Sequence, residues 1–335
     1  MTHSISVVIP NRNGAATIGK CLAAALASRH DNFEVIVVDD GSEDESVEVI
    51  RRFPCRLIRL AQHGGAAKAR NTGAQHSRGD VLFFTDSDCL LQSDSLAIAS
   101  QTLARAGPQS VVGGTYTPLP HDHRFFSIFQ SAFIHYCETK RPQHPDYLAT
   151  HALVIPTQMF RQSEGFREEF LPILEDVEFS HRLRRLGYRL VMNPALQVQH
   201  IFNFSLARSL ANAAFKASYW TLYSIRNGDL LSDSGTASVG LKLNGAVFFL
   251  GLLLLVLFFA TGNALFLSAL AVAVAFNLYG NRGLLRAFYE ADGLSFALGA
   301  TAYYLLLYPL AVGAGASVGV MKYLGDFFYK PGWRL

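Results

Sequence analysis

Three short apolar runs, each ending in polar residues, divide about the first 90 residues of the chain. Residues 5–9, 33–38 and 81–84 are rich in β-branched and aromatic side chains, which predicts buried strands. Residues 18–26 carry an apolar stripe at helical spacing, with Thr17 in the position of an N-cap. Strands that alternate with helices predict an α/β fold with a parallel sheet and right-handed crossovers.

The segment after the second strand carries a helix-start signal. Ser42 is followed three positions later by Glu45, which is the pattern of a capping box. We therefore expect a helix that opens at Ser42 and runs to about Phe53.

Pairs of carboxylates follow two of the predicted strands. Asp39 and Asp40 end the run 33–38, and Asp86 and Asp88 follow the run 81–84. Ligands of open α/β sheets bind at the carboxyl ends of the strands, where these side chains should emerge. Carboxylates repel each other unless a divalent cation such as Mg²⁺ or Mn²⁺ lies between them and a diphosphate. Taken singly, each pair is also compatible with an exposed turn or a helix cap.

Residues 63–73 form a glycine-containing segment between these acidic turns. Its glycines permit close backbone approach, and Lys68 and Arg70 supply positive charge for an anion at a helix start. The segment matches neither G-x-G-x-x-G nor a Walker loop. Both a Rossmann dehydrogenase and a P-loop kinase are therefore disfavoured.

A further acidic pair, Glu175-Asp176, stands at the start of a helix that Gly187 should end. By itself the pair could be an acidic first turn that complements the helix dipole.

The ordered motifs together resemble those of family 2 glycosyltransferases of GT-A fold over roughly residues 4–202. The motifs are Val8-Ile9-Pro10-x-x-Asn13, Val37-Val38-Asp39-Asp40-Gly41-Ser42, Ala69-Arg70-Asn71-x-Gly73, Asp86-x-Asp88 and Glu175-Asp176.

This resemblance implies inverting transfer of a sugar from a nucleotide diphosphate sugar, and a nucleotide site built from several motifs. Asp40 would contact the base and Asp39 would support that pocket, with Arg70 near the nucleotide. UDP-sugars are slightly favoured as donors. The implied nucleotide-binding residues are Pro10, Asn11, Asn13, Asp39, Asp40, Arg70 and Asp86.

The resemblance also implies a metal site and a catalytic pair. Asp88 would be the principal ligand of Mg²⁺ or Mn²⁺, with Asp86 beside it. A histidine in the position of His200 would complete the metal shell, and imidazole suits Mn²⁺ better than Mg²⁺. Asp176 would be the catalytic base and Glu175 would shape the acceptor side. An acceptor that is already a phosphate would need Asp176 less.

Two departures from the family pattern limit the analogy. No Q-x-x-R-W motif follows the helix, since residues 182–187 read Arg-Leu-Arg-Arg-Leu-Gly, so single transfer is favoured over a processive synthase. His151 stands where members often carry a small residue or Asn. It is expected to contact the acceptor or, alternatively, to be a satisfied buried histidine.

The sequence becomes markedly more apolar after about residue 205. The apolar runs 243–260, 265–279 and 296–320 predict a membrane region of two or three spans. Pro309 and three glycines leave open whether the third run spans or is re-entrant. We therefore expect a GT-A catalytic domain at 1–205, interfacial or linker helices at 206–240, and an all-α transmembrane region at 241–335.

Charge and cysteine usage favour the inner face of a cytoplasmic membrane. The N-terminus leads directly into the first strand without a signal-like segment, and the four cysteines have no paired spacing. Arg282, Arg286 and Lys322 prefer the cytoplasmic side of a multi-pass region. The net charge of +3 is dispersed, which argues against nucleic-acid binding.

These observations predict a membrane-anchored glycosyltransferase that adds one sugar to a lipid or polyprenyl-linked acceptor, giving a glycolipid. One alternative is an enzyme with a soluble or protein acceptor that uses the apolar segments only as an anchor. A second alternative is a non-catalytic nucleotide-binding membrane protein.

Overall fold

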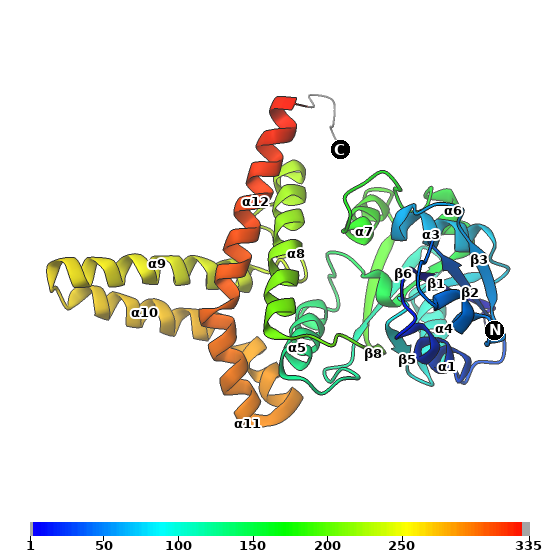
Figure 1. Ribbon diagram of the computed structural model, residues 1–335, viewed down its shortest axis with the longest axis horizontal. Helices are drawn as coiled ribbons and strands as arrows, with labels where there is room; N and C mark the ends of the chain where they lie inside the picture. Colours follow the sequence, from blue (N-terminus) through cyan, green and yellow to red (C-terminus); the bar gives the residue numbers. More distant parts are fainter. Residues whose placement is uncertain (1–2, 330–335) are drawn as a thin grey trace. The chain divides into compact units, whose positions relative to one another are not determined.

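The computed structural model describes residues 3–329 of the chain and shows two compact units (Figure 1). The first unit comprises Met1–Asp122 and Glu138–Phe202, and the second comprises His123–Cys137 and Asn203–Leu335. The first unit is built on a sheet, whereas the second is helical. Residues 123–137 therefore leave the first unit and return to it, which the sequence pattern did not indicate.

The first unit contains one eight-stranded sheet of mixed direction. Its strand order is β3-β2-β1-β4-β7-β6-β8-β5. The half formed by β3, β2, β1 and β4 is parallel, as predicted, whereas β7 runs antiparallel to both β4 and β6, and β5 runs antiparallel to β8. The strands are β1 (Ile5–Asn11), β2 (Phe33–Asp39), β3 (Arg56–Arg59), β4 (Val81–Phe84), β5 (Cys89–Leu91), β6 (Ser110–Tyr116), β7 (Leu153–Pro156) and β8 (Arg189–His200).

Helices flank this sheet and place side chains at its carboxyl edge. The predicted helix over residues 18–26 is observed, and Thr17 is its N-cap, although the Thr17 hydroxyl donates to the Gly14 carbonyl instead of capping the helix. The helices are α1 (Ile18–Leu26), α2 (Ser46–Ile50), α3 (Gly65–Gln75), α4 (Ser95–Ala106), α6 (Thr157–Gln162) and α7 (Glu175–Arg185), with a 3₁₀ turn at Thr150–Ala152.

The expected capping box at Ser42 is wrong. Helix α2 begins only at Ser46, and Glu45 is its N-cap without a side-chain hydrogen bond. The Ser42 hydroxyl instead donates to Asp39 Oδ1 at 2.5 Å. Asp39 is fully buried, and a buried carboxylate needs donors more than an exposed helix start does. The first acidic turn thus uses the serine that the helix was expected to use.

An aromatic cluster beneath the acidic edge fixes α6 and α7 against β4. Phe84 at the end of β4 lies 5.2 Å from Phe160 and 5.3 Å from Phe166, measured between ring centroids. Phe166 in turn lies 4.8 Å from Phe179 on α7. All four rings are buried. Close packing of this kind holds the start of α7 in a defined position relative to the end of β4.

The second unit consists of long helices, two of which are suited to a bilayer. Val239–Thr261 and Arg282–Gly325 are long and apolar enough to cross a membrane, whereas Leu265–Gly280 is a shorter apolar helix. Phe259 on the first of these helices is 81% exposed. The helices are α5 (Phe125–Thr139), α8 (Leu206–Asn227), α9 (Val239–Thr261), α10 (Leu265–Gly280), α11 (Arg282–Leu306) and α12 (Tyr308–Tyr329) (Figure 1).

Helices α8 and α12 run side by side because two glycines of α12 leave room for the α8 backbone (Figure 1). A Cβ added to Gly315 would overlap the Ala214 carbonyl, and one added to Gly319 would overlap the Ser218 carbonyl. Small residues four apart allow such close approach of helices in membranes. Pro309 is the second residue of α12, where its missing N–H costs no helical hydrogen bond. Leu307, between α11 and α12, keeps right-handed helical φ/ψ, whereas Asp292 and Gly293 interrupt α11 with non-helical φ/ψ.

Candidate active site

The carboxyl edge of the parallel half-sheet brings the predicted acidic motifs together. Asp39 ends β2, Asp86 follows β4, and Asp88 precedes β5. Glu175 and Asp176 begin α7 directly after Leu174, whose positive φ of 76° turns the chain into the helix. A leucine in the left-handed region is strained, and such strain is typical of functional sites.

Arg70 joins two of these motifs. Its Nη2 donates to Asp86 Oδ1 and its Nη1 donates to Glu175 Oε1, each at 2.6 Å, and the Arg70 side chain is only 5% exposed. Burial alone would raise the pKa of Asp86, but the charge of Arg70 and its hydrogen bond outweigh burial and lower it. Asp86 is therefore ionised at neutral pH. The sequence suggested Arg70 near the nucleotide, whereas its hydrogen bonds to Asp86 and Glu175 appear only in the structure.

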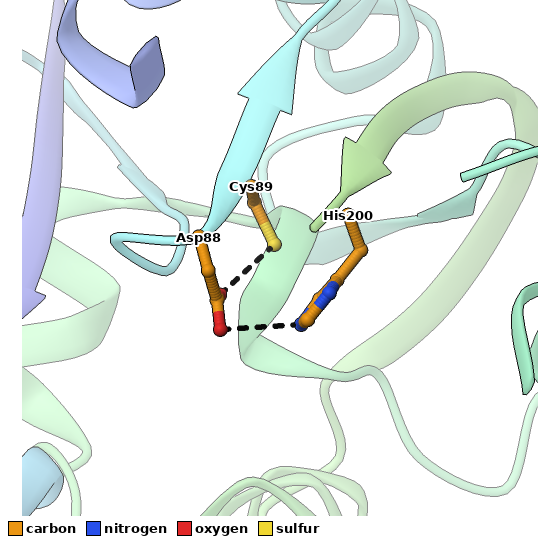
Figure 2. Close-up of side chains that lie close together, drawn as sticks. All are labelled: Asp88, Cys89 and His200. Carbon is orange, nitrogen blue, oxygen red and sulfur yellow. Dashed lines mark hydrogen bonds and ion pairs between the residues drawn. The ribbon is translucent and has the colours of Figure 1, made fainter. Parts of the chain in front are cut away.

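Asp88, Cys89 and His200 form a group whose ligand atoms all lie within 4.8 Å of one another (Figure 2). Strand β5 pairs with the end of β8, and this register places Cys89 opposite His200. His200 Nε2 lies 3.4 Å from Asp88 Oδ2. The structure thus brings together two of the three predicted metal ligands, Asp88 and His200.

The donor set of this group fits a hard or borderline divalent cation. Burial, and then the charge of Asp86, raises the pKa of Asp88 to about 7, although 39% of its side chain is accessible. A cation would relieve the repulsion between the two carboxylates. Burial also raises the pKa of the Cys89 thiol, and Mn²⁺ and Mg²⁺ prefer oxygen and nitrogen ligands to sulfur, so Cys89 is the weakest candidate ligand of the three. A carboxylate oxygen and an imidazole nitrogen remain, which suit Mn²⁺ or Mg²⁺.

Aromatic side chains orient His200 toward Asp88. The His200 ring stacks on Phe202 with centroids 3.8 Å apart, and Tyr116 meets it edge-on at 5.0 Å. Neither aromatic residue was identified from the sequence as part of the site. Both stand close to a strand end, which is the one signal that the sequence offered.

Asp176 is a carboxylate whose pKa lies close to 7. Its Oδ1 accepts a hydrogen bond from Val177 N at 2.9 Å, and its Oδ2 lies 3.4 Å from Thr150 N. Burial, and then the charge of Glu175, raises the pKa of Asp176 to about 7. A pKa in this range suits a general base at neutral pH.

His151 is buried within the 3₁₀ turn that also contains Thr150, and it has an acidic neighbour. Its ring stacks on Tyr116 at 4.0 Å, and its Nε2 lies 3.4 Å from Glu138 Oε2. Glu138 also accepts a hydrogen bond from the Thr115 hydroxyl at 2.8 Å. Burial favours the neutral ring, but the charge of Glu138 outweighs it and raises the pKa of His151. Sequence reasoning missed Glu138, whose only signal is an acidic residue at the end of an apolar helix.

Two of the predicted nucleotide carboxylates, Asp39 and Asp40, organise the loops around them. Asp39 accepts hydrogen bonds from Asn11 Nδ2 at 3.1 Å and from Ser42. Asp40 accepts from His63 Nδ1 at 2.7 Å and from the backbone N–H groups of residues 64 and 65 at 2.7 and 2.9 Å. These bonds explain why the glycine segment lies against the turn formed by Asp39 and Asp40.

Three residues of the first predicted turn lie beside the same carboxylates. Pro10 pairs with Val38 at the end of β1. Asn13 adopts a positive φ of 51°, and its N–H donates to the Ser42 hydroxyl at 2.9 Å. Asn11 is buried, and its side-chain oxygen lacks a hydrogen-bond partner within the part of the chain that the structure describes. The nucleotide contacts of these residues stay a prediction.

Part of the chain is similar in sequence to known glycosyltransferases. Residues 6–164 match the sequence model of Glycosyl transferase family 2. The glycosyltransferase GlyG of Streptococcus pneumoniae is 30% identical over 131 residues, covering 38% of this chain and 44% of that protein. The glycosyltransferase AglE of Haloferax volcanii is 36% identical over 125 residues, covering 35% and 41%. The match thus spans less than half the length of these curated relatives.

The fold of the chain is similar to that of a solved glycosyltransferase structure. The mannosyltransferase PcManGT of Pyrobaculum calidifontis, solved with GDP-mannose and Mn²⁺, superposes with a TM-score of 0.59 at 17% identity. The superposition covers 97% of this chain and 88% of that one. The α/β unit followed by helices is therefore the fold that the motifs predicted, and the chain carries a family 2 glycosyltransferase domain of GT-A fold.

Proposed function

We propose that this chain is a metal-dependent, inverting glycosyltransferase, anchored in a membrane, that transfers a single sugar from a nucleotide diphosphate sugar to a lipid or lipid-linked acceptor. One observation carries the proposal. A candidate cation site at Asp88 and His200 lies at the same edge of the sheet as the Asp176 carboxylate, whose pKa is about 7. At this edge Arg70 connects Asp86 with Glu175.

The metal side of the site would serve the leaving group. Asp88 and His200 would hold the cation, with Asp86 kept ionised beside them by Arg70. A bound divalent cation compensates the negative charge that develops on a departing nucleotide diphosphate. Imidazole favours Mn²⁺, and the fold neighbour PcManGT was solved with that ion. Asp40 would contact the base, with Asp39 supporting the turn; Pro10, Asn11, Asn13 and Arg70 complete the proposed nucleotide site.

The other carboxylate pair would serve the acceptor. An acceptor hydroxyl oxygen attacks the anomeric carbon as the bond from that carbon to the diphosphate oxygen breaks. The hydroxyl proton passes to the Asp176 carboxylate, whose pKa of about 7 allows it to accept a proton at neutral pH. Glu175, held by Arg70, would shape the pocket, and His151 would contact the acceptor. Attack opposite the leaving group inverts the anomeric centre.

The helical unit supports a lipid acceptor and a location at the cytoplasmic membrane. Two helices have the length and composition of membrane spans. An enzyme held at the bilayer meets a lipid substrate at high effective concentration. We place the catalytic unit on the cytoplasmic side, where nucleotide sugars are made, with 206–240 at the interface and 241–329 in the bilayer; residues 330–335 of the expected membrane region lie outside the described residues.

An assay of the full-length protein in detergent tests the proposal. Labelled UDP-, GDP- and dTDP-sugars are supplied with Mn²⁺ or Mg²⁺ and a membrane lipid extract, because PcManGT binds GDP-mannose while the motifs slightly favour UDP. We expect a labelled lipid with one added sugar, and none from the Asp88→Ala variant. Transfer only to soluble acceptors would contradict the lipid acceptor, and sugar chains would contradict single transfer. Nucleotide binding without hydrolysis or transfer would indicate a non-catalytic protein.

A further inference from the structure

A charge-free stretch of the chain folds as the α9–α10 hairpin. No Asp, Glu, Lys or Arg occurs between Lys242 and Arg282. Helices α9 and α10 lie side by side, and a Cβ added to Gly251 of α9 would lie 3.0 Å from Leu270 of α10 (Figure 1). Basic residues that flank membrane segments favour the cytoplasmic side. A stretch with a basic residue at both ends therefore returns to the side from which it started.

The outer surface of this hairpin is apolar and its length matches a bilayer. Helix α9 has 23 residues and α10 has 16, so they measure about 35 Å and about 24 Å, against a hydrocarbon core of about 30 Å. A short helix is accommodated by local thinning of the bilayer. The large apolar side chains exposed along the two helices include Leu253, Val256, Phe259, Leu265, Val272 and Phe276.

A closed ring of hydrogen bonds fixes the base of the hairpin to α11. Asn277 Nδ2 donates to Asn244 Oδ1, and Asn281 Nδ2 donates to Asn277 Oδ1, each at 2.8 Å. Asn244 Nδ2 donates to the Tyr304 carbonyl at 2.6 Å, and the Tyr304 hydroxyl donates to Asn281 Oδ1 at 3.2 Å. All four side chains are buried. Because each of these amides is hydrogen-bonded, the ring holds the hairpin in one position relative to α11.

Charged residues follow directly at this base. Arg282 begins α11, and its guanidinium lies 4.2 Å from the centroid of the Tyr279 ring. Arg286 and Glu290 form an exposed ion pair on the same helix. Charged groups and tyrosine rings are stable at the membrane interface and costly in the hydrocarbon core. The base of the hairpin therefore belongs at an interface, and its uncharged tip belongs at the opposite face.

Helix α12 is packed along α8 in a fixed register. Gly315 lies against the Ala214 carbonyl, and four residues later Gly319 lies against the Ser218 carbonyl, so the two helices run in the same direction. Further along α12, the Lys322 ammonium donates to the Ser218 hydroxyl at 3.3 Å. Helices that run together in this way must lie at the same depth in a membrane.

Helix α8 is too polar to cross a bilayer. Among the helices of residues 3–329, it is not one of those long and apolar enough to do so. It carries Arg208, Lys216 and Arg226 along its length, and charges in the hydrocarbon core are costly. A crossing by α8 would also carry Lys242 and Arg282 to the side away from the catalytic unit, against the preference of basic residues for the cytoplasmic side.

The depth shared with α8 excludes α12 as a span, although length and composition make Arg282–Gly325 a candidate. This segment is not one continuous helix, because Asp292 and Gly293 interrupt it with non-helical φ/ψ. A helix with protein on one side and an apolar stripe on the other suits a position in the plane of the interface. The exposed stripe of α12 recurs at helical spacing and comprises Leu310, Val318, Met321 and Leu324.

We infer that the α9–α10 hairpin is the part of the helical unit that crosses the bilayer, and that α8 and α12 lie in the interface on the side of the catalytic unit. The exposed stripe of α12 then contacts lipid at the depth of the head groups and upper acyl chains. The inference rests on the proposed membrane anchoring and narrows the crossing part of residues 241–329 to two helices. The interfacial pair lies at the face where a lipid presents its head group.

Depth measurements on the full-length protein in phospholipid bilayers test the inference. Bimane is attached to Leu253→Cys on α9 or to Met321→Cys on α12, because both side chains are exposed. The background is Cys55→Ser, since the other three native cysteines are buried. Lipids brominated at the chain ends should quench the α9 probe more strongly than lipids brominated near the head group, and the order should be reversed for the α12 probe. The same order at both probes would overturn the inference.

Labelling with a membrane-impermeant maleimide locates the sides. Spheroplasts and inverted membrane vesicles present opposite faces of the same membrane to the reagent. The exposed positions are Arg52 in the catalytic unit, Leu231 between α8 and α9, and Asn263 at the hairpin tip. We expect Arg52→Cys and Leu231→Cys to be labelled from one side and Asn263→Cys only from the other. Labelling of Leu231→Cys on the side of Asn263→Cys would show that α8 crosses, and would refute the inference.

Two charge substitutions at exposed positions form a matched pair. Leu253→Arg places a charge in the hydrocarbon core and should lower recovery of the protein in the carbonate-washed membrane fraction, whereas Met321→Arg at the interface should not. Both variants should unfold at the same temperature in detergent. Equal losses from the membrane would contradict the inference.

An inactive variant separates the membrane arrangement from the chemistry. Asp88→Ala should give the same depths and sides while it transfers no sugar, so failure of the arrangement and failure of the proposed enzymatic activity are distinguishable. Recovery of the unmodified protein in the soluble fraction would overturn the anchoring and the inference together.

Discussion

Arg70 Nη1 lies 2.6 Å from Glu175 Oε1, and these two residues are 105 positions apart in the chain. Because the other arm of Arg70 holds Asp86, one guanidinium connects the metal side of the site with the helix that carries Asp176. A guanidinium can donate to two carboxylates at once, whereas a lysine ammonium on a flexible chain cannot reproduce that fork.

We therefore expect Arg70→Lys to fold and to lose turnover by about 10- to 100-fold, as small displacements of catalytic groups do. Initial rates and thermal unfolding of the purified variant measure both effects. Arg184→Lys is the control, because Arg184 forms a more exposed pair with Asp146. A loss of turnover in Arg184→Lys equal to that in Arg70→Lys would contradict the special role of the bridge.

Asp88 and Cys89 are neighbours with opposite expected roles. Asp88→Ala should abolish Mn²⁺-dependent donor binding, because the diphosphate loses its compensating charge. Cys89→Ala should retain it, since Mn²⁺ prefers oxygen and nitrogen ligands to the sulfur of this buried thiol. Calorimetric titration of donor with and without Mn²⁺ compares the two. Loss of Mn²⁺ binding in Cys89→Ala would show that the thiol does belong to the metal shell.

The raised pKa of Asp176 predicts a pH profile. The carboxyl accepts a proton only in its ionised form, so kcat/KM should fall about tenfold per pH unit below pH 7 and level off above it. At saturating Mn²⁺, which keeps the Asp88 carboxylate ionised, Asp176→Asn should remove this limb and lower transfer to a hydroxyl by about 10²–10⁴-fold, while metal-dependent donor binding survives. Nearly normal turnover in Asp176→Asn would point to an acceptor that is already ionised, such as a polyprenyl phosphate.

The parts of the site that the sequence predicted are local. Apolar runs ending in Asp39 or Asp86 predict both the strand and the edge from which the carboxylate emerges, because strand and acid are adjacent in the chain. The bridge from Arg70 to Glu175 depends on how α7 returns to the sheet, which local patterns do not encode. The prediction of a capping box at Ser42 was wrong for a related reason. The Ser42 hydroxyl donates to the buried Asp39 carboxylate instead of capping a helix, because a tertiary contact overrides the local preference.

Glu138 is expected to act through His151. Burial favours a neutral imidazole, so removing the Glu138 charge should lower the pKa of His151. Nuclear magnetic resonance titration of the His151 ring in Glu138→Gln should show this decrease. If His151 contacts the acceptor, the KM for acceptor should rise while donor affinity stays unchanged. An unchanged ring titration in Glu138→Gln would show that the 3.4 Å pair contributes little.

The close approach of α8 and α12 gives a prediction about stability. Gly315→Leu places a side chain where the Ala214 carbonyl lies, and backbone atoms cannot move aside as a flexible side chain can. Overpacking of this kind costs about 1–3 kcal/mol, so the unfolding temperature in detergent should fall by several degrees.

Gly325→Leu on the same helix is the matched control, because a Cβ there meets no atom within 4 Å. Both substitutions replace a helical glycine with a residue of higher helix propensity, so a decrease only in Gly315→Leu isolates the interhelical contact. Equal unfolding temperatures would mean that the two helices can separate without loss of stability, and that the glycines of α12 are not required for packing.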